Sequence, residues 1–389
     1  MKRLSSLVLA GMLSLTFILP EVSAQEKKDA DLAKDVRSAI LIERDTGTVL
    51  YEKNSQEALP PASMTKVMTM LLIMEALDHG KLHINEKVRA SEYAASMGGS
   101  QIFLEAGEEM TVRELLKGIA IGSGNDASVA MAERIAGSEE AFVDMMNKKS
   151  SELGLKNTVF KNTTGLPAEG HVSTAADMAV MAKELLKYEE ITKYTGMYEA
   201  YLRENTDKKF WLVNTNKLVR FYPGVDGLKT GFTGEAKYCL TATAQKNGMR
   251  VIAVVFGAPT SKARNAQISK MFDYAFGHYE THPLFQRNIT VGEAQISKGS
   301  FKKINAVTSE PISILTKKGE KTEDIKKVII IKKNLHAPIN KGDKVGTIKI
   351  IKDGKVLQER PLVSNQNVSE AGWWTLYKRT MGMFTRAGQ

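Results

Sequence analysis

Cysteine is almost absent from this 389-residue chain, because Cys239 is the only one. A single cysteine excludes an intramolecular disulfide, so the stability of the fold must come from a packed core. The six histidines lie apart, and no His-Glu-x-x-His or clustered carboxylates occur, so we expect no metal site and no cofactor. Zinc-finger, aromatic RNA-binding and basic-helix patterns are also missing, which argues against nucleic acid as a partner.

Long apolar runs are equally scarce, and the main one spans Leu7 to Leu19 behind two basic residues. It is shorter than the roughly 20 residues that a membrane-spanning helix needs. Small residues precede Gln25, so the pattern predicts a signal peptide over 1–24, with a buried N-terminal helix as the alternative. The expected location is the outer face of the cytoplasmic membrane, as a peripheral protein, or the secreted fraction.

Acidic residues are outnumbered by basic ones, and the formal net charge is +10. The predicted leader contains two basic residues and one acidic residue, so its removal leaves +9. An anionic partner such as wall polymer or acidic lipid headgroups would fit this charge. The lysines are scattered, however, and a solvated basic surface fits them equally well.

Segment 25–281 is predicted to be an α+β catalytic domain, because strands at its two ends enclose a helical middle. Ser38 to Ile42 and Val49 to Glu52 form the first hairpin, and an apolar stripe at helical spacing begins close to Ser63. The other predicted elements are helices over 112–121, 127–136, 140–153, 174–186 and 263–279, and strands over 238–244 and 250–256.

Segment 282–368 differs in composition and is predicted to be a small all-β, sandwich-like domain. It consists of short stretches rich in isoleucine, valine and lysine, separated by turn signals. Its clearest hairpin pairs 346–351 with 355–363 around Asp353-Gly354.

The last segment, 369–389, changes character again and is predicted to form an amphipathic helix. Its aromatic and apolar residues share one helical face, which is typical of helices that lie in the membrane interface. Packing on the protein itself is the alternative. The residues expected to meet the membrane surface are Trp373, Trp374, Leu376, Tyr377 and Phe384.

The chemistry most plainly encoded is a hydroxyl and an amine three residues apart, in Ser63-Met64-Thr65-Lys66. At the start of a helix these side chains share one face, and the helix N-terminus adds positive potential for an oxyanion. Lysine can accept the serine proton only if burial or neighbouring cations lower its pKa from about 10.4. A helix cap is the alternative interpretation of Ser63.

The same spacing recurs in Ser300-Phe301-Lys302-Lys303, so the spacing alone does not identify the nucleophile. Ser63 opens a long apolar helix, whereas Ser300 falls in a polar part of the predicted β domain. We therefore expect Ser63 to lie beside the core and Ser300 to be solvated.

Two further short motifs carry polar groups. Ser123-Gly124-Asn125 lies between two predicted helices, where its hydroxyl and amide could relay a proton and hold a carbonyl group, or could form only a loop and a cap. Lys229-Thr230-Gly231 is predicted on an edge strand, where the side chains could bind a carboxylate; a surface turn is the alternative.

The order Ser-x-x-Lys, Ser-x-Asn, Lys-Thr-Gly resembles the penicillin-recognising serine hydrolases. Over nearly its whole length the chain is similar to low-molecular-mass penicillin-binding proteins of the serine D-alanyl-D-alanine carboxypeptidase type. The further matching stretches are Pro60-Pro61-Ala62, Gly122 to Ala127, Thr164-Gly165-Leu166-Pro167, Gly170 to Ala175 and Gly227-Leu228. The resemblance implies a β-lactamase/transpeptidase-like catalytic fold, with an antiparallel sheet and helices, followed by the β domain.

This resemblance implies that the enzyme removes the terminal D-alanine from peptidoglycan stem pentapeptides, in cell wall biogenesis and the control of cell shape. Ser63 would be the nucleophile that forms the acyl-enzyme, Lys66 its general base and Ser123 the proton relay. The backbone N–H groups of Ser63 and Phe232 would form the oxyanion hole. β-Lactam antibiotics such as penicillin would be covalent inhibitors.

The resemblance also implies a set of residues that bind the stem peptide. Asn125 would orient the substrate amide, and Lys229, Thr230 and Arg264 would hold the terminal carboxylate, with Gly231 leaving the backbone open to the ligand. Many relatives have histidine where this chain has Thr164, so no role is carried over to that residue.

Three other functions are alternatives to the carboxypeptidase. A serine β-lactamase would need fast deacylation, yet the Glu-x-x-Leu-Asn segment used by its best-known class is absent between Ser123 and Lys229. DD-endopeptidase activity remains open, and a non-catalytic wall-binding protein would leave the motifs without a purpose. A Ser-His-Asp triad of Ser123, His171 and Asp177 is a further alternative, although Gly-x-Ser-x-Gly is missing.

Overall fold

The computed structural model describes residues 31–320, 322–375 and 377–378. The leader predicted over 1–24, together with Leu376 and Phe384 of the predicted tail helix, lies outside these residues. None of the helices in the described part of the chain combines the length and the apolar character needed to cross a membrane.

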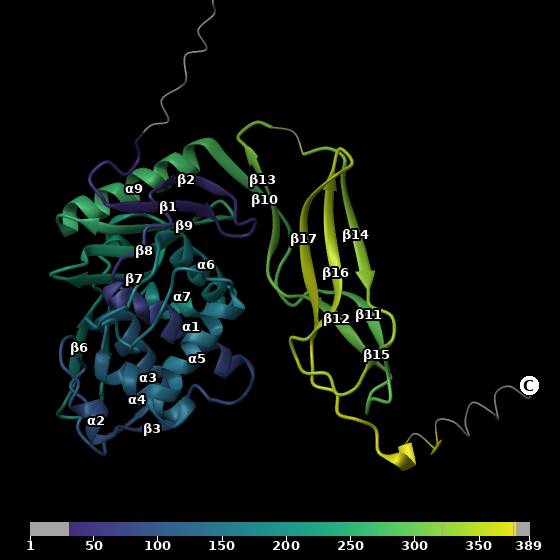
Figure 1. Cartoon of the computed structure of the whole chain (residues 1–389), viewed down its shortest axis with the longest axis horizontal. Coiled ribbons are helices and arrows are strands. Elements are labelled where there is room, and N and C mark those ends of the chain that lie inside the picture. Colours follow the sequence, from purple (N-terminus) through teal and green to yellow (C-terminus); the bar gives the residue numbers. More distant parts are fainter. Residues whose placement is uncertain (1–30, 321, 376, 379–389) are drawn as a thin grey trace, which may run out of the picture. The chain divides into compact units, whose positions relative to one another are not determined.

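The catalytic part is built on a five-stranded antiparallel sheet in the order β2-β1-β9-β8-β7 (Figure 1). Its central strands are buried on both faces, because apolar residues alternate between two cores: Ile252 and Val254 face one, and Val251 and Val255 the other. The strands are β1 Ser38–Glu43, β2 Val49–Lys53, β7 Val225–Thr233, β8 Lys237–Lys246 and β9 Met249–Ala258.

Helices cover both faces of this sheet. The helix α9, Ser261–His278, packs on one face, while α1, Lys66–Asp78, is buried in the helical block on the other. The remaining helices are α2 Glu92–Ala95, α3 Val112–Lys117, α4 Asn125–Ala136, α5 Glu139–Glu152, α6 Ala175–Leu185, α7 Thr192–Thr195 and α8 Leu218–Phe221, with short turns η1 Ala62–Thr65, η2 Gly118–Gly122 and η3 Glu189–Ile191. Two small hairpins pair β3 Lys87–Arg89 with β4 Glu109–Thr111, and β5 Glu199–Leu202 with β6 Phe210–Val213.

The C-terminal part is all β and has its own apolar core. Its strands are β10 Tyr279–Phe285, β11 Thr290–Ser297, β12 Lys303–Thr308, β13 Ile312–Lys317, β14 Ile325–Ile331, β15 Leu335–His336, β16 Lys344–Lys352 and β17 Lys355–Ser364. The predicted hairpin around Asp353-Gly354 is present as β16 and β17. The predicted limit between 281 and 282 falls inside β10, which pairs with β13. The α+β catalytic fold with a following β domain is thus confirmed.

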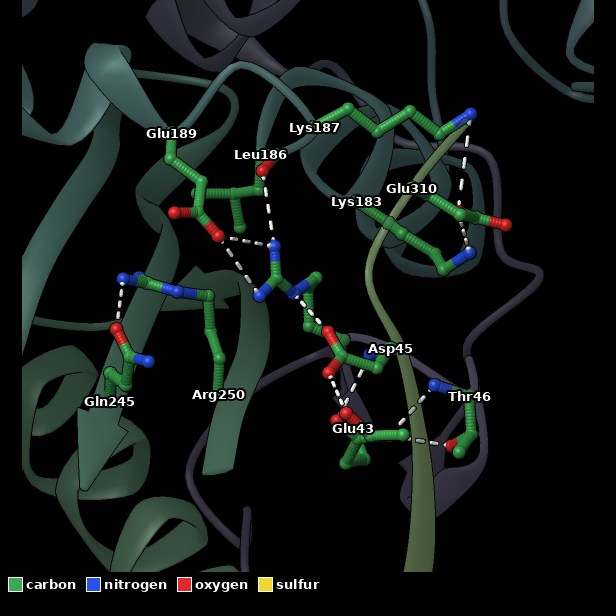
Figure 2. Close-up of polar contacts among 12 residues, drawn as sticks. Glu43, Asp45, Thr46, Lys183, Leu186, Lys187, Glu189, Gln245, Arg250 and Glu310 are labelled. Atoms are coloured by element: carbon green, nitrogen blue, oxygen red, sulfur yellow. Dashed lines mark hydrogen bonds and ion pairs between the residues drawn. The ribbon is translucent and has the colours of Figure 1, made fainter. Parts of the chain in front are cut away.

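Buried charges join the β domain to the catalytic sheet and to α6 (Figure 2). Glu310 accepts a hydrogen bond from Lys183 at 2.9 Å and forms an ion pair with Arg360 at 3.0 Å. Ser313 donates a short hydrogen bond to the Asp45 carboxylate in the β1–β2 turn. Removing one partner would leave a buried charge without compensation, which usually costs several kcal/mol, roughly 3 to 5.

Candidate active site

Ser63 and Lys66 meet where the η1 turn runs into α1. Lys66 Nζ lies 3.2 Å from Ser63 Oγ, and the lysine is fully buried, with 0% of its surface exposed. Burial disfavours the charged ammonium, so it holds the pKa of Lys66 well below its usual value, and the positive charge of Lys229 lowers it further. The amine beside the serine is therefore poised to be neutral.

Two other acceptors fix the direction of this amine. Lys66 Nζ donates to Asn125 Oδ1 and to the carbonyl oxygen of Thr164, each at 2.7 Å. A neutral amine has two N–H hydrogens and one lone pair. When both hydrogens point to these acceptors, the lone pair is left for the hydroxyl proton of Ser63. This arrangement is what a general base requires.

Ser123 follows a structure that differs from the helix predicted over 112–121. The α-helix ends at Lys117, and the chain widens into a π-turn, Gly118–Gly122, that delivers Ser123 in the left-handed conformation with φ +64°. At Gly122 an added Cβ would lie 2.8 Å from Leu212 Cδ2, so a larger residue would require the Leu212 side chain to move. Local wide turns of this kind are frequent at functional sites, and Ser123 is buried at this one.

Asp126, which sequence reasoning did not single out, supports the backbone segment that lies next to Asn125. Its carboxylate accepts hydrogen bonds from the backbone N–H groups of Ile102, Leu104 and Ala127. Its position in the first turn of a helix, directly after Ser-x-Asn, was the available signal. The bonds to Ile102 and Leu104 fasten segment 102–104 to the start of α4.

Lys229, Thr230 and Gly231 lie on β7, which is the edge strand of the sheet, as predicted. Lys229 is buried, with 1% exposed, and burial followed by the charge of Arg264 lowers its pKa to about 7. A Cβ at Gly231 would lie 2.7 Å from the carbonyl oxygen of Pro61, so the glycine lets β7 pass close to the Ser63 turn.

Arg264 lies in the first turn of α9 and is also buried. Burial lowers its pKa to about 10, and its Nε donates to Asn265 Oδ1 at 3.0 Å. Together with Lys229 it gives the site a buried cationic character. Such a site favours a ligand that brings a negative charge, because the anion would relieve the repulsion between cations.

Thr215 is a second residue that sequence reasoning missed. Thr230 Oγ1 donates to Thr215 Oγ1 at 2.7 Å. The buried amides of Asn214 and Asn216 hold this loop through bonds to Thr195 O, Met197 O and Gly227 O. A threonine in a loop carries no local sequence signal, because only the tertiary fold brings it to β7.

A groove of about 480 Å³ adjoins the Ser63 turn. Its walls are the Pro60-Pro61-Ala62 segment, the loop 165–172, and Thr233 and Glu235 after β7. Gly165 has φ +84°, and a Cβ on it would overlap the carbonyl oxygen of Ala62. The backbone of this loop therefore packs directly on the turn that carries the nucleophile.

The two competing assignments do not match the geometry. Both ring nitrogens of His171 are engaged, with Thr65 Oγ1 at 2.9 Å and the backbone N–H of Lys161 at 3.4 Å. Asp177 instead accepts from Thr158 at 2.8 Å, so the Ser-His-Asp alternative fails. In the Ser300 motif, Lys303 is exposed and paired with Glu293 at 2.7 Å, so it is not a buried amine as Lys66 is.

Two family models match the chain. D-alanyl-D-alanine carboxypeptidase (Peptidase_S11) covers residues 23–260, and the C-terminal domain of penicillin-binding protein 5 covers 279–370. The D-alanyl-D-alanine carboxypeptidase DacF of Bacillus subtilis is 66% identical over 99% of this chain and 100% of its own length. DacA of Escherichia coli is 34% identical over 87% of this chain and 85% of its own.

Solved structures agree with these matches. Penicillin-binding protein 5 from Haemophilus influenzae superposes with a TM-score of 0.65 at 31% identity, over 86% of this chain and 98% of its own. Penicillin-binding protein D2 from Listeria monocytogenes was solved in its ampicillin-bound form. It superposes with a TM-score of 0.56 at 31% identity, over 62% of this chain and 98% of its own. By sequence, fold and structural relatives, the chain belongs to the serine-type D-alanyl-D-alanine carboxypeptidase family, Peptidase_S11.

Proposed function

We propose that this carboxypeptidase removes the terminal D-alanine through an acyl-enzyme on Ser63, with Lys66 as the general base. The observation that carries the proposal is the fully buried Lys66 amine, which lies 3.2 Å from Ser63 Oγ. Its two other hydrogen bonds go to acceptors, so the neutral form is oriented toward the serine.

In the first step Lys66 takes the proton of Ser63, and Ser63 Oγ attacks the carbonyl carbon of the penultimate D-alanine. The developing oxyanion is stabilised by the backbone N–H groups of Ser63 and Phe232. Ser123 passes a proton to the departing amine of the terminal D-alanine. Water then hydrolyses the ester on Ser63 and regenerates the enzyme.

The terminal carboxylate is held by Lys229 and Thr230, and Arg264 reinforces the positive charge. Gly231 lets β7 approach the turn that carries Ser63, so the strand and the nucleophile can line the same peptide site. Asn125 anchors Lys66 and orients the substrate amide. The groove next to the Ser63 turn would take the stem peptide on the acyl side.

The role of Lys229 predicts a pH dependence of substrate binding. Its pKa of about 7 means that the free enzyme loses this charge as the pH rises through 7. KM for a substrate with a free terminal carboxylate should rise by up to about tenfold between about pH 7 and about pH 9. Steady-state kinetics across this range is the measurement, and a carboxamide-terminated peptide is the control, since it should show no such rise. A KM that stays constant for the carboxylate substrate would remove Lys229 from the binding role.

Release of D-alanine from diacyl-Lys-D-Ala-D-Ala is the test of the proposed reaction. We expect release of one D-alanine per peptide, with penicillin blocking it through a long-lived adduct. Rapid turnover of penicillin would instead favour the β-lactamase alternative, and cleavage of crosslinked dimers would add endopeptidase activity. A folded protein that binds penicillin yet releases no D-alanine would contradict the proposal.

We also propose that the protein is exported and attaches peripherally to the outer face of the cytoplasmic membrane. The exposed rings of Trp373, Trp374 and Tyr377 stack at centroid distances of 5.4 to 5.5 Å. Exposed tryptophan and tyrosine favour the headgroup layer. Leu376 and Phe384 would extend the same membrane-facing surface.

The attachment predicts a difference between the mature chain and a version ending at residue 368. The mature chain should sediment with vesicles containing about 30% anionic lipid, whereas the shortened version should stay in the supernatant. Equal sedimentation of both would show that the tail is not the anchor. Unchanged D-alanine release by the shortened version from a soluble peptide would confirm that its catalytic part is intact.

A further inference from the structure

The β5–β6 hairpin presents two large aromatic rings on its outer face. Tyr201 and Trp211 are directly opposite each other in the antiparallel register, so their side chains lie on the same face. Tyr201 is 41% exposed and Trp211 56%, while Leu202 and Leu212 point inward and are buried. The two leucines therefore pack into the core of the domain, and the two aromatic rings remain exposed to solvent.

Two charged groups hold these rings in place, one beside the Trp211 ring and one over the Tyr201 ring. Trp211 Nε1 donates to Glu199 Oε2 at 3.3 Å, and Lys209 Nζ lies 4.1 Å from the centre of the Tyr201 ring. Holding side chains in place before a ligand arrives lowers the entropy lost on binding. We call Tyr201 and Trp211 the aromatic platform.

The platform is continuous with the active site. Leu212, on the inner face of β6, packs against Gly122, which directly precedes Ser123. After β6 the chain reaches Thr215, whose backbone N–H donates to Ile121 O at 3.3 Å and whose hydroxyl accepts from Thr230. Figure 1 places β6 at the margin of the helical half of the catalytic domain.

A second set of contacts ties the hairpin to the wall of the site. Arg203, which follows β5, donates to the carbonyl oxygens of Ile102 and Phe103, each at 3.1 Å, and pairs with Glu108. The Phe103 ring packs edge-on against Phe210 with centroids 5.5 Å apart. Ile102 and Leu104 are also bonded to Asp126 next to Asn125, so the hairpin is fixed to the segment that supports Asn125.

We infer that the aromatic platform binds pyranose rings of the glycan strand that carries the stem peptide. The inference rests on the proposed function and adds a polysaccharide subsite to it. A pyranose ring has an apolar C–H face that packs on a flat aromatic ring, and its hydroxyl and acetamido groups lie at the edges. Glu199 and Lys209 at the platform margin supply an acceptor and a donor for those groups.

The charged groups of Glu199 and Lys209 also favour a sugar over the other candidate ligands. If lipid acyl chains or an apolar protein surface covered the rings, the neighbouring carboxylate and ammonium would lose their water. This desolvation would be unfavourable, because such a ligand offers the two charges no hydrogen bonds. A glycan can hydrogen-bond to both groups. Its connection to the stem peptide would also bring the sugar and the scissile bond to neighbouring parts of one surface.

Binding to glycan without stem peptides tests the platform apart from catalysis. The full mature chain with Ser63→Ala would be incubated with insoluble wall glycan stripped of its peptides, and compared with the same protein carrying Tyr201→Ala and Trp211→Ala. We expect the added substitutions to weaken binding about tenfold or more. Phe301→Ala is the matched control, because Phe301 is a 53% exposed ring on the β domain and should leave binding unchanged.

Equal binding by the platform variant would overturn the inference, as would a loss of vesicle binding in place of glycan binding. Turnover gives a second measure in the active enzyme, namely the ratio of kcat/KM for glycan-linked pentapeptide to kcat/KM for the small diacyl-tripeptide. This ratio should fall about fivefold or more in the platform variant and recover with Trp211→Phe and Tyr201→Phe. An unchanged ratio would mean that the hairpin is only structural. Absence of D-alanine release by the wild type would refute the proposed reaction but leave the binding result readable.

Discussion

Replacing Ser63 by alanine should lower the rate of D-alanine release by about 10⁴-fold or more and abolish covalent labelling by penicillin. The reason is that no other hydroxyl is hydrogen-bonded to the buried Lys66 amine, among the residues that the structure describes. Removing a nucleophile from a catalytic unit leaves only the contribution of binding and of the oxyanion hole. Release kinetics and labelled-protein gels measure the two effects.

Ser300→Ala is the matched control for this variant. Ser300 has the same spacing to a lysine, but Lys303 is exposed and paired with Glu293 and so is not a buried amine. The control should keep full activity and labelling. Labelling that survived in Ser63→Ala, or vanished in Ser300→Ala, would show that the nucleophile is not Ser63.

The second large effect is expected for Lys66→Met, which keeps the length of the side chain and removes the amine. Acylation should slow by about 10³- to 10⁴-fold, because the serine loses its proton acceptor. The measurement is the second-order rate of penicillin labelling under single-turnover conditions. Substrate binding should suffer less than acylation, since Lys229 and Arg264 remain to attract the carboxylate.

The control for Lys66→Met is Lys303→Met, which should label at the wild-type rate. Thermal unfolding of both variants separates a catalytic loss from a folding defect. Lys66→Met leaves Asn125 Oδ1 and Thr164 O without this donor, so some destabilisation, about 1 to 3 kcal/mol, is expected. A folded Lys66→Met protein that acylates at the wild-type rate would exclude lysine as the base.

Much of the fold follows from local patterns that the sequence displays. Strands β1 and β9 alternate between two apolar cores, and the stripe beginning at Val67 matches the buried helix α1, so element types were predictable. The break at Gly118–Gly122 was not, because a π-turn and an α-helix share almost the same apolar spacing. The turn is also packed against Leu212 of the distant strand β6, a tertiary contact that no local pattern shows.

In the candidate site, too, some residues were predictable from the sequence and others were not. Ser63, Lys66 and Asn125 were predicted from motifs, and the structure joins them in one hydrogen-bonded group. The carbonyl group of Thr164 and the hydroxyl of Thr215 were not identifiable, since a backbone atom has no sequence signature and a lone threonine has many roles. Both come from loops that are distant in sequence and are brought to the site by packing.

The acyl-enzyme on Ser63 is tested most directly by mass spectrometry of the intact protein after brief exposure to penicillin, followed by location of the modified peptide. The predicted result is a mass increase of one penicillin molecule, long-lived and carried by the peptide that contains Ser63. An adduct on Ser123 or Ser300, or rapid penicillin hydrolysis with no adduct, would contradict it.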